Sequence, residues 1–181
     1  MDTENILFQT TLLVIAIAYK YLLARENVWG WILSATSSIL SCLYVFIYFK
    51  LPILISLELC FMSLSLYGIY KYVKNLAYLT RIDFIIIALT MVAIIYFVFK
   101  QLETKTVWYE IAGSVTFLSG VVFMAQKNRT SKMIAWINFI LGSLFIGVVV
   151  FQKHAYILLL LHIISVVIGC YAIKRLKITS S

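Results

Sequence analysis

Residues 133–152 read MIAWINFILGSLFIGVVVFQ, an apolar run without a charged side chain. About 20 mostly apolar residues in an α-helix cross the hydrocarbon core of a bilayer, so this run predicts a membrane-spanning helix. A single lysine, Lys153, separates it from a second run at 154–173, HAYILLLLHIISVVIGCYAI. Two spans joined by so short a turn predict a helical hairpin inside the membrane.

Five more runs of this kind precede the hairpin, at 5–23, 28–49, 51–72, 82–99 and 108–126. Backbone groups in lipid must satisfy one another, so we predict an all-α membrane protein of seven transmembrane helices. The first run follows Asp2 and Glu4 rather than a basic segment, and no Ala-x-Ala site follows it. We therefore interpret it as a retained helix and not as a signal peptide.

The composition agrees with a bilayer as the solvent. Of the 181 residues 64% are hydrophobic and only 12% are charged, and the mean hydropathy is +1.02. A soluble domain is about 45–50% apolar and about 25% charged, so a soluble fold is excluded. The net charge is +8, and the basic residues that produce it lie between the spans. They form no basic stripe with interleaved aromatic residues, so no nucleic-acid partner is expected.

The three cysteines lie inside apolar runs without CxxC spacing, so we predict no metal, no disulfide and no cofactor. The basic residues predict the orientation. With seven spans, four lie on the side of the N-terminus (Lys50, Lys100, Lys105, Lys153) and eleven on the other (Lys20, Arg25, Lys71, Lys74, Arg81, Lys127, Arg129, Lys132, Lys174, Arg175, Lys177). The positive-inside rule then places the N-terminus outside and the C-terminus in the cytoplasm.

The order of landmarks suggests an internal repeat. Trp31 and Ser38 in the second run align with Trp136 and Ser143 in the sixth. We predict a first three-helix bundle at 1–76, a linker helix at 77–104 and a second bundle at 105–181. Chance similarity between apolar helices is the alternative. Parallel repeats are a known transporter plan, with the substrate bound near the midplane between them.

Several short motifs carry a resemblance to a known family: ENVWGW at 26–31, the Ser37-Ser38 pair, Lys50-Leu51, LSLYG at 64–68 and Trp136-Ile137. They resemble the PnuC family of bacterial vitamin transporters. The resemblance implies a three-one-three fold similar to SWEET transporters, located in the bacterial inner membrane. It also implies facilitated diffusion of a vitamin precursor that a cytosolic kinase traps by phosphorylation, and in many relatives a homo-trimer.

Members of that family carry nicotinamide riboside, and relatives carry thiamine or riboflavin. Nicotinamide riboside carriers have a WxxWxxxN pattern on the sixth helix, where this chain has Met133, Trp136 and Ile140. Asn138 lies about 200° around the helix from Trp136 and does not replace the missing asparagine. Glu58 stands where a glutamine is common in the family. These departures favour thiamine over nicotinamide riboside.

Glu58 is the carboxylate deepest inside a predicted span. A charge at this depth costs at least about 3 kcal/mol, so such residues face a cavity or a partner. No basic partner within a span is evident. We predict that Glu58 faces the central pathway and counters a cation, since thiamine and nicotinamide riboside both carry a fixed positive charge. A protonated glutamic acid bonded to a neighbouring helix and a proton-coupling role are the alternatives.

The full candidate substrate-binding set is Glu58, Trp136, Trp31, Tyr44, Ser65, Tyr67, Asn138, Ser143 and Trp108. Trp136 is predicted to stack on the ligand, and Ser65 follows Glu58 by two turns on the same face. Trp108 is also interpreted as an interfacial anchor, and the two tyrosines as packing residues.

Two titratable residues outside this set are interpreted structurally. Glu110 is expected to be a solvated carboxylate at a helix start. His162 is expected to be a hydrogen-bonded core residue, with proton relay as the alternative.

The chain has no Walker loop and no nucleophile–base constellation, so we expect no enzyme. The sequence predicts a carrier for a small cationic vitamin, thiamine ahead of nicotinamide riboside, working by alternating access between two three-helix bundles. A membrane-embedded interaction subunit is the rival function.

Overall fold

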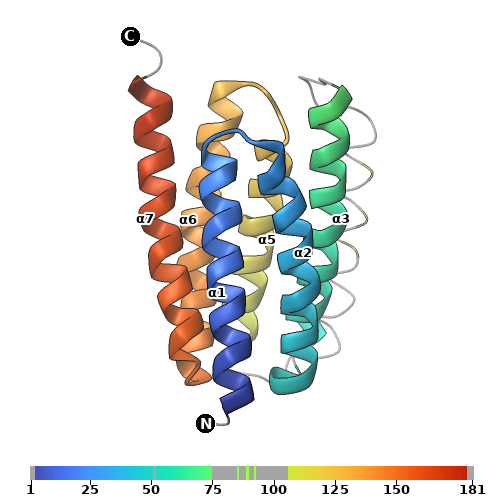
Figure 1. Cartoon of the computed structure of the whole chain (residues 1–181), viewed down its shortest axis with the longest axis vertical. Helices are drawn as coiled ribbons and strands as arrows, with labels where there is room; N and C mark the ends of the chain where they lie inside the picture. The colour runs from blue at the N-terminus through green and yellow to red at the C-terminus, as the bar shows by residue number, and fades with distance from the viewer. Residues whose placement is uncertain are drawn as a thin grey trace.

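The computed structural model describes residues 3–50, 52–74 and 106–178, together with Ile85, Leu89 and Val92. Within these residues the chain is all α, as predicted, and no strand occurs. The predicted fourth span at 82–99, and the linker segment 77–104 that contains it, lie outside the described residues apart from those three positions. The helices are α1 (Thr3–Ala24), α2 (Val28–Tyr44), the π-helical turn η1 (Val45–Phe49), α3 (Pro52–Lys74), α5 (Val107–Met124), α6 (Arg129–Gln152) and α7 (Tyr156–Ile178) (Figure 1).

Five of these helices are long and apolar enough to cross a membrane: α1, α2 extended to Tyr48, α5, α6 and α7. The remaining helix, α3, has 23 residues and carries Glu58 in its interior. The count of seven spans stays a prediction, because the fourth falls outside the described part of the chain.

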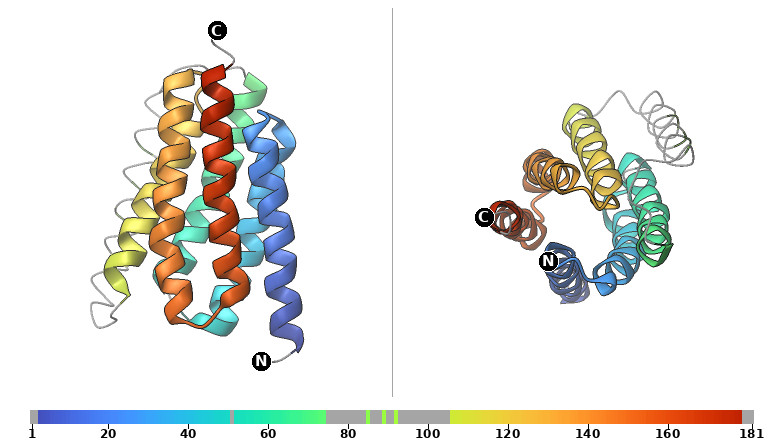
Figure 2. Two further views of the ribbon diagram at one scale, coloured as in Figure 1. Left: turned by 90° about the vertical axis from the view of Figure 1, so that its left-hand side faces the viewer. Right: turned by 90° about the horizontal axis from the view of Figure 1, so that it is seen from above.

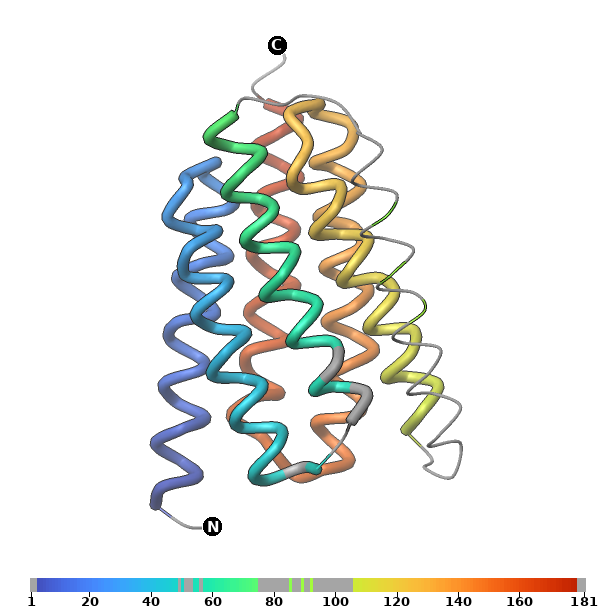
Figure 3. The backbone as a smooth tube through the Cα atoms, turned by 90° about the vertical axis from the view of Figure 1, so that its right-hand side faces the viewer, coloured from blue at the N-terminus to red at the C-terminus, as the bar shows by residue number. Residues whose placement is uncertain are grey.

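The six α-helices form a closed ring when viewed along the bundle axis (Figure 2). In ring order, α1 packs against α2 and α7, α3 packs against α2 and α5, and α6 packs against α5 and α7. The two termini lie at opposite ends of the bundle, so α1, α3, α5 and α7 run one way and α2 and α6 the other (Figure 3). We call α1–α3 the first half and α5–α7 the second half.

The two ends of the bundle differ in charge. The end at which α1, α3, α5 and α7 finish is called the basic end, and the opposite one the N-terminal end. Within the described ranges, the N-terminal end carries Lys50 and Lys153. The basic end carries Arg25, Lys71, Lys74, Lys127, Arg129, Lys132, Lys174, Arg175 and Lys177.

Glycines let α5 and α6 approach closely. A Cβ atom at Gly113 would lie 2.5 Å from the Ile146 side chain, and one at Gly120 would lie 2.8 Å from the Phe139 ring. In lipid there is no hydrophobic driving force between helices, so small residues favour helix association by letting the backbones pack closely. The second half is therefore held together by close backbone packing, and the polar groups described next are concentrated where the two halves meet.

Candidate functional site: a central cavity between the two halves

A cavity lies inside the ring and is lined by residues of all six described α-helices. Its volume is about 110 Å³. In α2, α3, α6 and α7 the lining residues lie nearer the N-terminal end, whereas those of α1 and α5 lie around and beyond the middle of the helix. The lining residues are Leu12, Ala16, Tyr19, Lys20, Ser37, Ser38, Ser41, Tyr44, Val45, Leu54, Leu57, Glu58, Phe61, Phe117, Ile146, Val150, Leu158, Leu161 and His162. Most of its polar lining comes from the first half.

Glu58 stands on the wall of this cavity, on the inner face of α3. The Ser38 hydroxyl from α2 hydrogen-bonds to its carboxylate. The residue is half-buried. A carboxylate in this place can attract a cation, because the apolar surroundings screen its charge far less than water does.

Lys20 of α1 also lines the cavity, which corrects the assignment of this lysine to a flanking loop. Its side chain is only 7% exposed. Its ammonium donates a hydrogen bond to the Ser165 hydroxyl of α7 and interacts electrostatically with Glu58. The expectation that Glu58 has no basic residue near it was therefore wrong. The reason is helical register: Lys20 follows Leu12 and Ala16 at four-residue steps and shares their buried face.

His162 of α7 completes the titratable groups on the cavity wall. Its ring centroid lies 6.4 Å from that of Phe117. Its buried Nδ1 atom has no hydrogen-bond partner among the residues that the structure describes. The expectation of a hydrogen-bonded core histidine is thus wrong for this nitrogen, because the neighbouring ring and aliphatic side chains offer it no polar group. Nδ1 can receive a bond from a ligand in the cavity.

Tyr44 lies at the cavity wall on α2, with 1% of its surface exposed. Its hydroxyl donates to the Asn5 side chain at 3.0 Å, and its ring packs against Phe8 and Tyr48. The structure thus gives Tyr44 both roles considered for it, a packing residue whose edge forms part of the wall.

The two tryptophans that the repeat pairs meet in an aromatic layer next to the cavity. Trp31 and Trp136, 6% and 2% exposed, line one narrow space together with Phe61, Phe117 and Phe139. The rings of Trp136 and Phe139 meet edge to face, with centroids 5.5 Å apart. Lys20 lines both this narrow space and the cavity. Trp31 lines both this narrow space and a further space at the basic end. Trp136 therefore lines this narrow space and not the cavity that contains Glu58.

The remaining predicted residues lie away from the cavity. Ser65 is fully buried and shares a 2.9 Å hydrogen bond with Ser34 between α3 and α2. Tyr67 stacks on Tyr70 at 6.2 Å, and the Lys71 ammonium lies 5.5 Å from its ring. On the α3 face that Ser65 and Glu58 share, Ser65 therefore packs against α2 and Glu58 lines the cavity.

Three further candidates belong to the second half. Trp108, at the start of α5, is 73% exposed, which fits an interfacial anchor. Asn138 is half-buried on α6 and lines none of the cavities described here. Ser143 is buried, and its hydroxyl has no partner within the described residues.

Glu110 also departs from expectation. It is 1% exposed, not solvated, and one carboxylate oxygen accepts a 2.6 Å hydrogen bond from the Thr106 hydroxyl. Thr106 precedes α5, so this bond joins the helix start to its first turn. The prediction failed because a position in the first turn does not by itself say which way the side chain faces.

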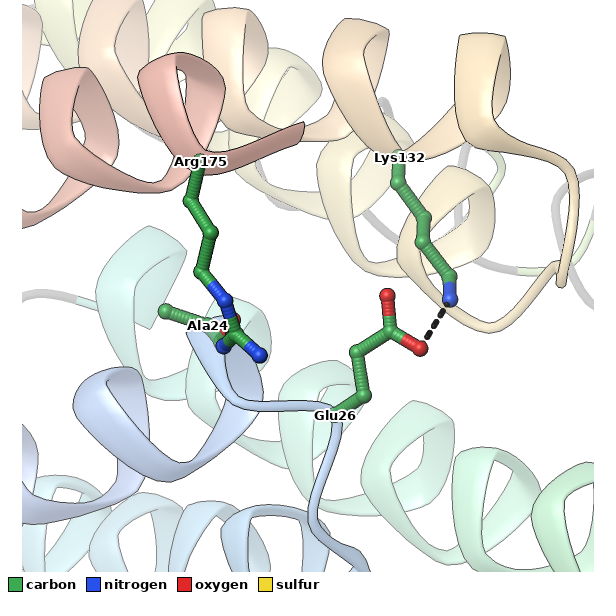
Figure 4. A network of polar contacts seen from close by, with 4 residues as sticks. All are labelled: Ala24, Glu26, Lys132 and Arg175. Atoms are coloured by element: carbon green, nitrogen blue, oxygen red, sulfur yellow. Dashed lines mark hydrogen bonds and ion pairs between the residues drawn. The ribbon is translucent and has the colours of Figure 1, made fainter. Parts of the chain in front are cut away.

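At the basic end the two halves are tied together by a pair of contacts that we call the latch (Figure 4). Lys132 of α6 forms an ion pair with Glu26 in the turn between α1 and α2, at 2.8 Å. Arg175 of α7 donates to the Ala24 carbonyl at the end of α1, also at 2.8 Å. Both contacts cross from the second half to the first, so they tie the two halves together at the basic end.

A ring of apolar helices around a cavity whose largely apolar wall carries Lys20, Glu58 and His162 is typical of a multi-pass membrane protein. The comparisons agree. The model of the nicotinamide mononucleotide transporter family matches residues 6–175, nearly the whole chain. The chain belongs to this family, and the resemblance to PnuC proteins is confirmed. The comparisons with curated proteins and with solved structures gave no significant match.

Proposed function

We propose that the protein carries a small cationic vitamin or vitamin precursor across the membrane, and that Glu58 binds the positive charge of the substrate. The observation that carries the proposal is a carboxylate on the wall of a cavity to which all six described helices contribute. Unit charges 4 Å apart attract by about 4 kcal/mol at an effective dielectric constant near 20. The nearby rings of Phe61 and Tyr19 offer faces that also favour a cation.

Two substrates fit this chemistry. Thiamine is the first candidate, because its thiazolium is a fixed cation and its aminopyrimidine can share a proton with a carboxylate. The departures from the nicotinamide riboside pattern around Trp136 support this choice. Nicotinamide riboside, whose pyridinium is also a fixed cation, is the second candidate, supported by the nicotinamide compound in the family's name.

Alternating access between two repeated halves is the proposed mechanism. The same type of helix start supports a repeat, although the caps lie four residues before Trp31 and eight before Trp136: Asn27 caps α2 by accepting from the Trp29 N–H, and Asn128 caps α6 by accepting from the Thr130 N–H. The turns that follow α2 and α6 each contain one left-handed residue, Lys50 and His154. Seven helices in a three-one-three order, with the linker at 77–104, complete this proposal.

The proposed orientation places the basic end in the cytoplasm. The charge difference between the ends supports it, and removal of Lys20 from the count leaves ten basic residues against four. A membrane-impermeable thiol reagent applied to intact cells is then expected to label Gln152→Cys at the N-terminal end and not Lys174→Cys at the basic end. The native cysteines are first replaced by serine. The reverse labelling pattern would contradict the orientation.

Substrate binding is tested by titration of the detergent-purified protein with thiamine, nicotinamide riboside and riboflavin, read by calorimetry or tryptophan fluorescence. We expect tight binding of one cationic vitamin and at least a tenfold loss of affinity in Glu58→Gln. Glu4→Gln, an exposed carboxylate at the start of α1, is the matched control and should bind as the wild type does. Equal affinity in Glu58→Gln and the wild type, with both folded, would rule out the binding role.

Transport itself is tested in liposomes. Saturable uptake of the bound vitamin by the pure protein would exclude the rival function of a membrane-embedded interaction subunit. The family resemblance further suggests that a cytosolic kinase traps the vitamin and that the carrier forms trimers. Encapsulated kinase with ATP should then increase accumulation beyond equilibration, whereas an unchanged plateau would argue against trapping.

A further inference from the structure

Lys20 is the charged group that the proposed binding role of Glu58 leaves unexplained. An ammonium inside a membrane helix is costly and is retained where it has partners or a function. Lys20 is 7% exposed and lies two turns along α1 from Leu12, on the face that lines the cavity. It therefore belongs to the same enclosed space as Glu58.

Ser165 fixes the position of the ammonium. The Ser165 hydroxyl donates to the Leu161 carbonyl at 2.6 Å, which leaves its oxygen lone pairs to accept from Lys20. The ammonium also lies 6.0 Å from the Phe117 ring and 5.8 Å from the Tyr19 ring, both within cation–π range. These partners belong to α1, α5 and α7, so Lys20 bridges the two halves.

The ammonium does not form an ion pair with Glu58 in this structure. Glu58 has its hydrogen bond from Ser38, and Lys20 has its own with Ser165, while the two charges still attract each other across the cavity. The other titratable group on this part of the wall is His162 of α7, which also lies within the field of Lys20. The carboxylate is thus partly neutralised from a distance and remains accessible to a ligand.

We propose that Lys20 is a resident counter-cation of Glu58 that competes with the cationic substrate, and that Ser165 holds it off the carboxylate. Lys20 then determines how tightly the cavity binds a cation relative to a neutral molecule of the same shape. This inference rests on the proposed binding of a cation at Glu58.

A carrier needs such a competitor because it must release what it binds. A single carboxylate in a poorly screened cavity would hold a cation strongly, and transport requires binding weak enough for the ligand to leave. Repulsion from Lys20 lowers the affinity for every cation and leaves a neutral ligand almost unaffected. When the substrate departs, attraction from Lys20 replaces part of the lost interaction and stabilises the empty carboxylate.

The test measures Kd for thiamine and nicotinamide riboside beside their neutral counterparts, deazathiamine and reduced nicotinamide riboside. Lys20→Met keeps the length and apolar stem of the side chain and removes the charge. We expect it to bind the cationic vitamin about tenfold more tightly, as loss of repulsion across a cavity predicts. The Kd for the neutral analogue should stay within twofold. Lys74→Met, an exposed lysine at the end of α3, is the control with unchanged binding.

Ser165→Ala gives a second test with the opposite sign, and it retains the lysine if Lys20→Met does not fold. Without the Ser165 oxygen the ammonium can pair directly with Glu58, so cation binding should weaken several-fold. In the Lys20→Met background the same change should have no effect. Unchanged or weaker cation binding in Lys20→Met, or tighter cation binding in Ser165→Ala, overturns the inference while the Glu58 role stands. Failure of the wild type to bind either cation overturns both.

Discussion

A single glycine determines how closely α3 can approach α2. A Cβ atom on Gly68 would lie 2.3 Å from Cε3 of Trp31, inside the ring's own volume. Gly68→Ala gains at most about 1 kcal/mol of helix propensity, whereas overpacking costs about 1–3 kcal/mol. We therefore expect a lower thermal unfolding midpoint in detergent, and weaker substrate binding if Trp31 is displaced toward the aromatic layer.

Gly147 is the matched control for this prediction. A Cβ atom there would meet the side chains of His162 and Leu159 at 3.7 Å and 3.8 Å, which are ordinary contacts. Gly147→Ala should be neutral or slightly stabilising, because helix propensity then acts without a clash. If the two variants unfolded at the same temperature, the close contact between Gly68 and Trp31 would not be a determinant of stability.

At the scale of residues, the sequence identified Glu58 from its depth in a span and Trp31 and Trp136 from the repeat. It missed Lys20, because a lysine four residues from the end of a helix looks like a flanking charge. The signal was its spacing of four and eight residues from Ala16 and Leu12, which a count of loop charges does not use. The sequence also could not show that the rings of Trp136 and Phe139 meet edge to face, because ring orientation depends on the packing of the surrounding side chains.

At the scale of elements, the two asparagine caps are expected to stabilise the helices that begin at the basic end. The Asn27 side chain accepts from the Trp29 N–H at 3.0 Å, and Asn128 accepts from the Thr130 N–H at 3.0 Å. Loss of such a cap costs about 1 kcal/mol. Asn27→Ala and Asn128→Ala should each lower the unfolding midpoint in detergent, with additive effects, because the two caps are independent.

Aspartate at the same positions is the control for the capping prediction. Asn27→Asp retains the side-chain acceptor and places a negative charge at a helix N-terminus, so it should unfold no earlier than the wild type. Equal destabilisation by alanine and aspartate would mean that the amide group acts through some contact other than the cap.

Element boundaries followed from hydropathy almost everywhere. The predicted runs at 5–23, 51–72 and 108–126 correspond to α1, α3 and α5 within a few residues. The largest departures are α7, which ends at Ile178 and not at 173, and α6, which begins at Arg129 and not at 133 because Asn128 caps a polar first turn that hydropathy excludes. The π-helical turn after Tyr44 was not predicted, since its apolar residues have no feature that distinguishes a π-turn from an α-helix.

At the scale of the whole molecule, the sequence predicted a repeat but not the contacts between its halves. Ring order places the halves against each other at α1/α7 and at α3/α5. Most residues that line the cavity lie toward the N-terminal end, whereas the aromatic layer and the latch lie toward the basic end. Glu26 and Lys132 are more than 100 residues apart, so no local pattern reveals their pairing.

Breaking the latch should shift the carrier toward opening at the basic end. Glu26→Gln removes the ion pair with Lys132 and keeps the size of the side chain. A partly exposed pair contributes up to about 1 kcal/mol, which changes the ratio of open to closed forms by about fivefold. Spin labels on Lys74→Cys and Lys174→Cys, in a chain without other cysteines, report the separation of α3 and α7 at this end. We expect a larger population of long distances in Glu26→Gln.

The control must remove a basic-end contact that does not cross between the halves. Arg129 provides it, because its guanidinium donates to the Lys177 carbonyl at 3.2 Å within the second half. Arg129→Gln changes the charge at this end by one unit in the opposite direction, and it should leave the distance distribution as in the wild type. If Arg129→Gln lengthened the distances as much as Glu26→Gln does, the effect would come from the loss of any polar contact at this end. The two halves would then be held together at the basic end by the aromatic layer and not by the latch.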